Sequence, residues 1–198
     1  MLQAKTKENG RFQVLKAIII DSTATELTLI VLNGDKQNIY VGNGGQRRHT
    51  SEILTELDRL LTESGLKAKE VEYIGVVVGP GSFTGIRIGV ATANAMALAS
   101  GARLVELTEL ECMLHGYQNA LAMIDCKHDN YYCLLKDGTS MEYMAKNISE
   151  LTEISVERVL YSAPIPQKLI ATFVEKVQNG EFSAVAKPYY MKKSSAEA

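Results

Sequence analysis

The segment GPGSFTGIRIG, residues 79–89, is the part of this sequence whose residue types most suggest chemistry. A glycine-rich turn between a strand and a helix often binds phosphate, because backbone N–H groups and the helix dipole both face the anion. A Walker loop needs Lys and then Ser or Thr after its last glycine, but Ile86 and Arg87 follow Gly85. A dinucleotide-binding fingerprint needs a glycine where Thr84 stands. Neither pattern is met, so only the free N–H groups at the helix start are left as a weak anion site.

The helix after this turn carries a small residue at every fourth position. These residues are Gly81, Gly85, Gly89, Ala93 and Ala97. An interior glycine costs a helix roughly 1 kcal/mol relative to alanine, so the spacing needs a reason. Residues four apart share a helix face, and this face therefore allows another backbone to approach closely. On spacing alone we favour packing within the chain, against its own sheet or another helix, over packing against a second subunit.

Cysteine and histidine residues form a second pattern, since both residue types ligate zinc. Cys112 and His115 belong to a predicted helix, whereas Cys126 and His128 lie at a strand end, so the two pairs are on different elements. For covalent catalysis, Ser82 and Cys126 lack a histidine and a carboxylate arranged nearby in the sequence. We therefore predict no metal site and no catalytic residue.

Two segments that resemble each other indicate how the chain is organised. They are AIIIDSTATELTLIVLNGD, residues 17–35, and LAMIDCKHDNYYCLLKDG, residues 121–138. Each has an apolar strand ending in Asp, a short polar turn, a second strand, and a turn containing Gly and Asp, which predicts a β-hairpin. The sequence therefore indicates a diverged internal duplication.

The elements after each hairpin predict an α/β protein with two related lobes of the order βββαβα. In the first half we expect a strand at 39–41, a helix at 51–63, a buried strand at 71–78, a helix ending near 100 and a strand at 103–107. In the second half we expect strands at 141–144 and 157–163, a turn of helix near 149 and a helix at 166–178. Thr108 and Glu111 have capping-box spacing. We divide the chain into a flexible extension (1–13), a first lobe (14–108) and a second, shortened lobe with a C-terminal tail (109–198).

Composition limits the classes of function. The chain has 198 residues, 46% of them apolar, and a formal net charge of −2. Independent nucleic-acid binding usually needs a basic surface, which this charge does not favour. The apolar run at 17–20 ends at Asp21, far short of the roughly 20 residues of a membrane span. With three cysteines and no evident secretory segment, we expect a cytoplasmic protein with free thiols and no membrane contact.

With these motifs in view, the sequence from Ala17 onward resembles the TsaB (YeaZ-type) family. The resemblance is carried by IIIDSTATELTLIVL in the first hairpin, His49-Thr50 before the Leu-rich helix, GPGSFTGIRIGVATANAMA, AMIDCKHDNYY and KPYYMKK. The chain departs from the family in having Asp21-Ser22-Thr23 where Asp-Thr-Ser is commoner, an N-terminal extension and a shorter second lobe.

The resemblance implies an actin/Hsp70-like (ASKHA) fold, sometimes filed with the glycoproteases, without catalysis or cofactor of its own. In such systems a larger catalytic paralogue transfers a threonylcarbamoyl group from threonylcarbamoyl-adenylate to N6 of adenosine 37, in tRNAs that read ANN codons. The TsaB-like subunit binds this paralogue through two helices of its first lobe, and a small P-loop ATPase subunit joins them. The chain would meet tRNA only through this complex, and a homodimer through the same helices is an alternative.

Site residues follow from the resemblance. We assign the partner interface to the helices at 51–63 and 84–99, with the residues Ile53, Leu57, Leu60, Gly85, Ile86, Gly89, Ala93 and Ala97. The catalytic paralogues use His-x-x-x-His to bind metal, but here Ile53 follows His49 at that spacing. Asp21 and Asp125 stand where actin-like ATPases place carboxylates near magnesium and phosphate. They are a candidate nucleotide site, although we favour a structural role for each at its strand end.

Two enzyme functions remain as alternatives. An actin-like ATPase or sugar-kinase-like enzyme would use Asp21 and Asp125, and nucleotide hydrolysis that depends on both would indicate it. A metallopeptidase is the function that the glycoprotease grouping suggests, and the missing second histidine weakens it.

Overall fold

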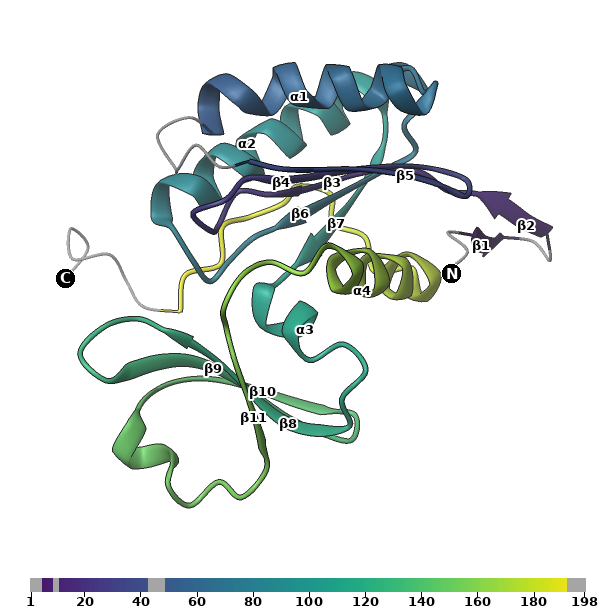
Figure 1. Cartoon of the computed structure of the whole chain (residues 1–198). Coiled ribbons are helices and arrows are strands. Elements are labelled where there is room, and N and C mark those ends of the chain that lie inside the picture. Colours follow the sequence, from purple (N-terminus) through teal and green to yellow (C-terminus); the bar gives the residue numbers. More distant parts are fainter. Residues whose placement is uncertain (1–4, 9–10, 43–48, 192–198) are drawn as a thin grey trace.

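The computed structural model describes residues 5–8, 11–42 and 49–191 and shows two lobes (Figure 1). The sheet of the first lobe has the strand order β5-β4-β3-β6-β7. Its strands are β3 (Lys16–Asp21), β4 (Thr28–Asn33), β5 (Lys36–Val41), β6 (Tyr73–Val77) and β7 (Arg103–Leu107). The strands β3, β6 and β7 are parallel, while β4 is antiparallel to β3 and β5 is antiparallel to β4. This places the hairpin predicted at 17–35 at the centre of the lobe.

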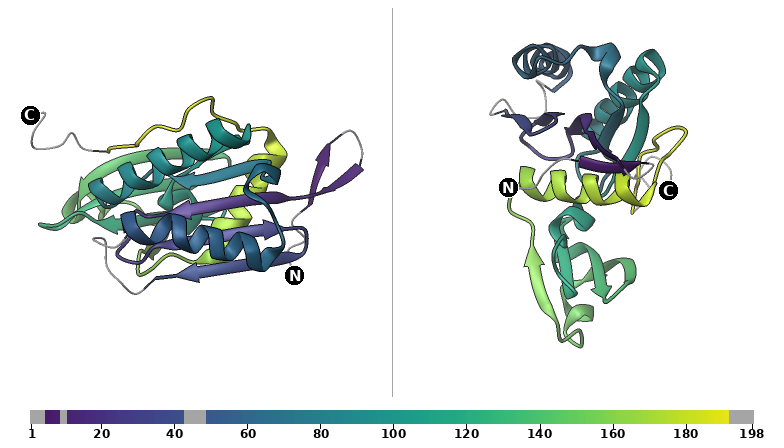
Figure 2. Two further views of the ribbon diagram at one scale, coloured as in Figure 1. Left: turned by 90° about the horizontal axis from the view of Figure 1, so that it is seen from above. Right: turned by 90° about the vertical axis from the view of Figure 1, so that its right-hand side faces the viewer.

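Helices cover both faces of this sheet, as Figures 1 and 2 show. On one face lie α1 (His49–Ser64) and α2 (Phe83–Ser100), and on the other lies α4 (Pro166–Asn179). Alternate residues of β3 explain the two layers, because successive side chains of a strand point to opposite faces. Ile18 and Ile20 are buried with α1 and α2, while Ala17 and Ile19 are buried with α4.

The second lobe is a four-stranded sheet with the order β10-β9-β8-β11. Its strands are β8 (Asn119–Asp125), β9 (Asn130–Asp137), β10 (Ser140–Asn147) and β11 (Glu157–Leu160). One face packs on α3 (Glu109–Met113), and the other is covered by η3 (Ile148–Leu151) and the residues that follow it. The hairpin predicted at 121–138 is present, and η3 stands where the first lobe has α1. A further turn of 3-10 helix, η2 (Ala68–Glu70), precedes β6.

Several predicted helix ends are confirmed. Gly101 and Gly180 follow α2 and α4 in the left-handed conformation, with φ of 75° and 73°. Thr108 caps α3, accepting the Glu111 N–H at 3.1 Å, while the Glu111 carboxylate accepts the Thr108 N–H at 2.9 Å.

The packing departs from the predicted division of the chain in one respect. The second-lobe range 109–198 includes α4, but α4 packs against the first sheet. Its apolar stripe of Leu169, Ile170, Phe173, Val174 and Val177 is buried there, because the α1/α2 layer leaves that face of the sheet uncovered. The C-terminal segment 182–190 also returns to the first lobe. The lobes are therefore tied together by elements that follow the second lobe in the sequence.

The range 1–13, expected to be a flexible extension, holds a short hairpin in its described part. The strands β1 (Lys5–Glu8) and β2 (Arg11–Val14) pair antiparallel, and β2 leads directly toward β3 (Figure 1).

Candidate functional site

The glycine-rich segment lies against the turn that follows β3. Ser82 donates its backbone N–H to the Thr23 carbonyl oxygen at 2.8 Å, and the Ser22 hydroxyl donates to the Gly85 carbonyl oxygen at 2.8 Å. A Cβ atom on Gly85 would collide with the Ser22 carbonyl oxygen, and one on Gly89 would collide with Ser22 Oγ. The two glycines are therefore required by close packing within the chain, the interpretation that spacing alone favoured.

This packing involves the residues that the sequence assigned to the partner interface. Each of the eight assigned residues is buried inside this chain: Ile53, Leu57, Leu60, Gly85, Ile86, Gly89, Ala93 and Ala97. The physical reason is that the apolar face of α1 and the small-residue face of α2 both point to the sheet of the first lobe. A partner can contact these helices only through their other faces.

The exposed face of α2 has a pattern of its own. Thr84, Ile88, Ala91, Ala95 and Leu98 follow one another at spacings of four, three, four and three residues, which places them on one side of a helix. Ile88 is half-buried, the other four are exposed, and Leu98 reaches 89% exposure. We call these five residues the outer stripe of α2. The sequence analysis predicted an interface on the neighbouring glycine face and did not consider this stripe.

Aromatic residues gather at the start of α2. The rings of Phe83 and Tyr190 stack with their centroids 4.8 Å apart, and the Arg87 guanidinium carbon lies 3.8 Å from the Phe83 ring centroid. Arg87 Nε also donates to the Tyr190 hydroxyl at 3.1 Å. Aromatic and arginine side chains are enriched at the energetic centres of protein interfaces, and this cluster borders the outer stripe.

The two aspartates proposed for a nucleotide site are placed very differently. Asp21 is fully buried, and its Oδ1 accepts the Thr23 N–H at 2.9 Å and the Thr23 hydroxyl at 2.7 Å. Asp125 is exposed, and its Oδ1 accepts the Lys127 N–H at 2.7 Å. Each carboxylate thus bonds to the turn that follows its own strand, as in the structural role we favoured. A nucleotide site built on both remains a hypothesis.

A cavity of about 870 Å³ lies beside the junction of the lobes. Its lining comes from the ends of β6 and β7, from α3, α4 and β10, and from the C-terminal segment: Val78, Glu106, Thr108, Glu111, Tyr143, Lys176, Ser183, Ala184, Val185, Lys187, Pro188 and Tyr189. This volume is within the range of ligand sites in proteins.

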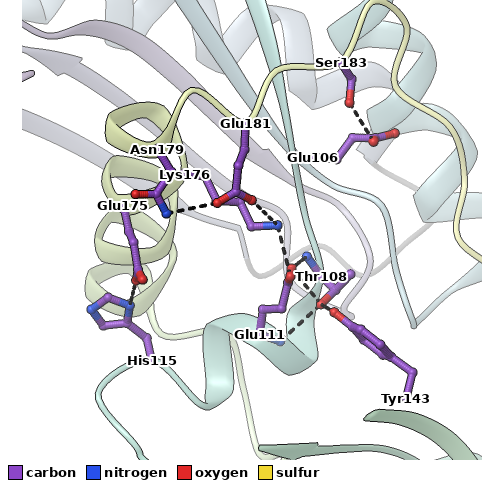
Figure 3. Close-up of polar contacts among 10 residues, drawn as sticks. All are labelled: Glu106, Thr108, Glu111, His115, Tyr143, Glu175, Lys176, Asn179, Glu181 and Ser183. Carbon is purple, nitrogen blue, oxygen red and sulfur yellow. Dashed lines mark hydrogen bonds and ion pairs between the residues drawn. The ribbon is translucent and has the colours of Figure 1, made fainter. Parts of the chain in front are cut away.

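A polar network at this cavity joins the lobes (Figure 3). The hydroxyl groups of Thr108 and Tyr143 lie 3.0 Å apart, which connects α3 to β10 of the second lobe. Glu111 Oε2 accepts the Thr108 hydroxyl at 3.0 Å, while Glu111 Oε1 accepts the Lys176 ammonium of α4 at 3.0 Å. Burial, followed by the charge of Glu111, raises the pKa of Tyr143 far above its ordinary value, so this phenol stays neutral.

The C-terminal segment forms one wall of the cavity. Glu106 accepts the Ser183 hydroxyl at 2.8 Å and the Lys187 N–H at 2.6 Å, and the Asn94 side chain exchanges two 2.9 Å hydrogen bonds with the Ala186 backbone. Residues 183–190 are therefore a strap fastened to the first lobe. Sequence analysis did not find this strap, since its hydrogen bonds join residues some 80 to 90 positions apart.

The cavity lining contains no cysteine or histidine among the described residues. Cys112 is buried, and burial raises the pKa of its thiol well above the ordinary value, so it is a poor nucleophile. The one ion pair of a histidine within the described part of the chain joins His115 Nδ1 to Glu175 Oε2 at 3.3 Å, outside the cavity lining (Figure 3). No three His, Cys, Asp or Glu side chains converge on a metal position within the described ranges. The His49 side chain lies outside what the structure describes.

Comparison with known proteins places this geometry in a family. The model of the family TsaD, tRNA N6-adenosine threonylcarbamoyltransferase, matches residues 37–195, most of the chain. The chain belongs to this family. Within it, the chain is similar to proteins named TsaB and to structures named YeaZ, which are described below.

Two curated relatives are named tRNA threonylcarbamoyladenosine biosynthesis protein TsaB. The Haemophilus influenzae protein is 31% identical over 126 residues, which are 61% of this chain and 53% of that protein. The Escherichia coli protein is 31% identical over 124 residues, 60% of this chain and 53% of that protein. The chain thus spans about half the length of these two relatives.

Solved structures support the fold. YeaZ from Pseudomonas aeruginosa matches with a TM-score of 0.72 and 18% identity over 89% of this chain and 99% of that chain. A second Pseudomonas aeruginosa structure, an uncharacterized protein with similarity to peptidase YeaZ, matches with a TM-score of 0.72 and 17% identity. The predicted α/β fold with two lobes is confirmed, and the YeaZ structures share it. Within the ranges that the structure describes, no helix combines the length and apolarity needed to cross a bilayer.

Proposed function

We propose that this chain is a non-catalytic, activating subunit in the synthesis of N6-threonylcarbamoyladenosine at position 37 of tRNAs that read ANN codons. It acts by binding the catalytic threonylcarbamoyltransferase paralogue of its own family. The family match and the names of the two TsaB relatives support this assignment.

The observation that carries the proposal is the outer stripe of α2. Its spacing of four and three residues is that of a seam between packed helices, and alanines at its centre allow the axis of a second helix to approach to about 8–10 Å. Leu54, on the exposed side of α1 and 60% exposed, adds apolar surface on the neighbouring helix. Both helices lie on the side of the first lobe opposite the second lobe (Figure 1), so a partner can dock without touching the second lobe.

A larger assembly follows from the same proposal. The chain meets tRNA only through the paralogue, since its formal net charge of −2 does not supply a basic surface of its own. A P-loop ATPase subunit joins the pair, and the location is the cytoplasm. A homodimer through the outer stripe would compete with the paralogue, because both would bury the same residues.

An alternative function is that of an actin-like ATPase or kinase-like enzyme. The inter-lobe cavity of about 870 Å³ is the observation that favours it. It would require a catalytic carboxylate, and Asp21 and Asp125 are both engaged by the turns that follow their strands.

A reconstituted modification assay tests the proposed function. The catalytic paralogue, the ATPase subunit, tRNA and a source of threonylcarbamoyl-adenylate are combined with and without this chain, and modified adenosine is measured. We expect modification to depend on the chain, and the Asp125→Asn variant to support it as well as the wild type. Modification that proceeds equally without the chain would contradict the proposal, and ATP hydrolysis by the chain alone that Asp125→Asn abolishes would favour the enzyme.

A further inference from the structure

A buried carboxyl group at the junction of the lobes has no part in the proposed function. Glu109 is the first residue of α3 and is only 3% exposed. Its backbone N–H donates to the Gly79 carbonyl oxygen at 3.0 Å, which fixes the start of α3 against the first lobe. Its side-chain Oε2 is buried and has no hydrogen-bond partner among the described residues. An ionised carboxylate in this position would lose its hydration without compensation.

The charge that acts on Glu109 is that of another acid, Asp21. Asp21 is fully buried at the end of β3, and the two donors of Thr23 that it accepts favour its ionised form. Two carboxylates in one buried region do not both ionise readily, so the proton of the pair resides on Glu109. Burial first, and the charge of Asp21 second, raise the pKa of Glu109 well above the ordinary value.

Titratable groups from both lobes surround the pair. Tyr161, which follows β11 of the second lobe, has its pKa raised by burial and then by the charges of Glu109, Asp21 and Glu26. Cys112 of α3 has its pKa raised by burial and then by Glu109. Each of these neighbours is neutral or negative.

Two further charged groups of the described residues lie near this region. Glu111, two residues after Glu109, contributes a further negative charge at Cys112. The ammonium of Lys176 on α4 is already paired with Glu111 at 3.0 Å and with Glu181 at 3.8 Å. A second negative charge on Glu109 would therefore be opposed from β3, from α3 and from the second lobe.

From this arrangement we propose that Glu109 is a proton-controlled latch between the two lobes. In its neutral form it lets α3 and Tyr161 pack over the Asp21 carboxylate. When it loses its proton, the buried pair must be hydrated, and the contact between the first lobe and the Tyr161 segment opens to admit water. The proposal concerns the lobe contact alone and does not depend on the partner surface on α2.

The sign of the pH dependence follows from the raised pKa. The pKa of Glu109 is about 4.3 in the unfolded chain and higher in the folded chain. At a pH between these two pKa values, the native state binds one more proton than the unfolded state. The stabilisation is complete below this window and is lost as pH rises through it. A Glu109→Gln variant has a neutral side chain at every pH, so its stability should not fall over this pH range.

The test measures the compactness of the chain by small-angle X-ray scattering along a pH series toward alkaline pH. The measurement compares the wild type with Glu109→Gln and with a matched control, Glu153→Gln, whose site is exposed on the second lobe. Circular dichroism shows whether each protein stays folded. We expect the radius of gyration of wild type and control to rise over the same pH interval, while Glu109→Gln stays compact. A wild type that stays compact until it unfolds, or a Glu109→Gln variant that expands with it, overturns the proposal.

A second measurement on the wild type does not rely on a variant that folds. Carboxyl carbon NMR of protein labelled at glutamate should show one resonance that titrates well above the rest. If every glutamate titrates near its ordinary value, the latch does not exist. Repeating the scattering series with Mg²⁺ tests the alternative that a cation lies between the two carboxylates. If Mg²⁺ keeps the wild type compact at alkaline pH, and has no effect on Glu109→Gln, a metal ion and not a proton controls the contact. That result would overturn the proposal.

Discussion

At the scale of single residues, the contact between Gly89 and Ser22 determines which face of α2 the sheet occupies. A leucine at position 89 would collide with Ser22 Oγ, so Gly89→Leu should lower the free energy of unfolding by about 1–3 kcal/mol or more. Urea denaturation of this variant and of Ala91→Leu, an exposed position on the same helix, provides the measurement and its control. Unchanged stability in Gly89→Leu, with loss of partner binding alone, would show that the face lies between molecules.

Gly89 also shows how much of the packing of α2 could be predicted from the sequence. The four-residue spacing of Gly81, Gly85 and Gly89 correctly indicated a close approach of backbones, because only glycine leaves the required space. It could not identify the partner in that contact, since the Ser22 turn is more than 60 positions away in the chain. The family resemblance then favoured an intermolecular contact through residues that the structure buries within the chain.

Among the elements, α2 has two faces with separate roles, one packed on β3 and one exposed. Ala91→Arg places a long charged side chain in the middle of the outer stripe, where a second helix would have to approach. We expect this variant to bind the catalytic paralogue at least tenfold more weakly while its thermal stability is unchanged, as measured by titration calorimetry and melting. Ala145→Arg, an exposed alanine on β10 of the second lobe, is the matched control and should bind normally. Equal affinity of the two variants would remove the outer stripe from the interface.

The strap at 183–190 gives a second prediction for an element. Asn94→Ala removes both hydrogen bonds to the Ala186 backbone, which leaves a buried amide without its partner and weakens the strap by about 1–3 kcal/mol. Hydrogen exchange should become at least several-fold faster in residues 183–190, with little change in β3. Asn38→Ala on β5 serves as control. Protection of the strap that is the same in Asn94→Ala and wild type would mean that other contacts hold it.

Considered as a whole, the molecule has the order of elements that the sequence indicates. Each apolar strand that ends in Asp, and each helix with a glycine just after it, was recognisable because these signals are local. The placement of α4 was not recognisable in the same way. Its stripe around Phe173 shows that one face is buried, but nothing local shows that it is buried against the first lobe rather than the second. The strap and the Glu109–Asp21 pair were missed for the same reason.

The central claim is that this two-lobed chain works by holding another protein on the α1/α2 side of its first lobe. Size-exclusion chromatography with light scattering, on the purified chain alone and mixed with the catalytic threonylcarbamoyltransferase paralogue from the same cell, tests it most directly. We expect a stable complex of one copy of each, into which any homodimer of the chain dissolves. If the mixture elutes as two separate proteins at concentrations of tens of micromolar, and the chain alone hydrolyses nucleotide, the account is contradicted.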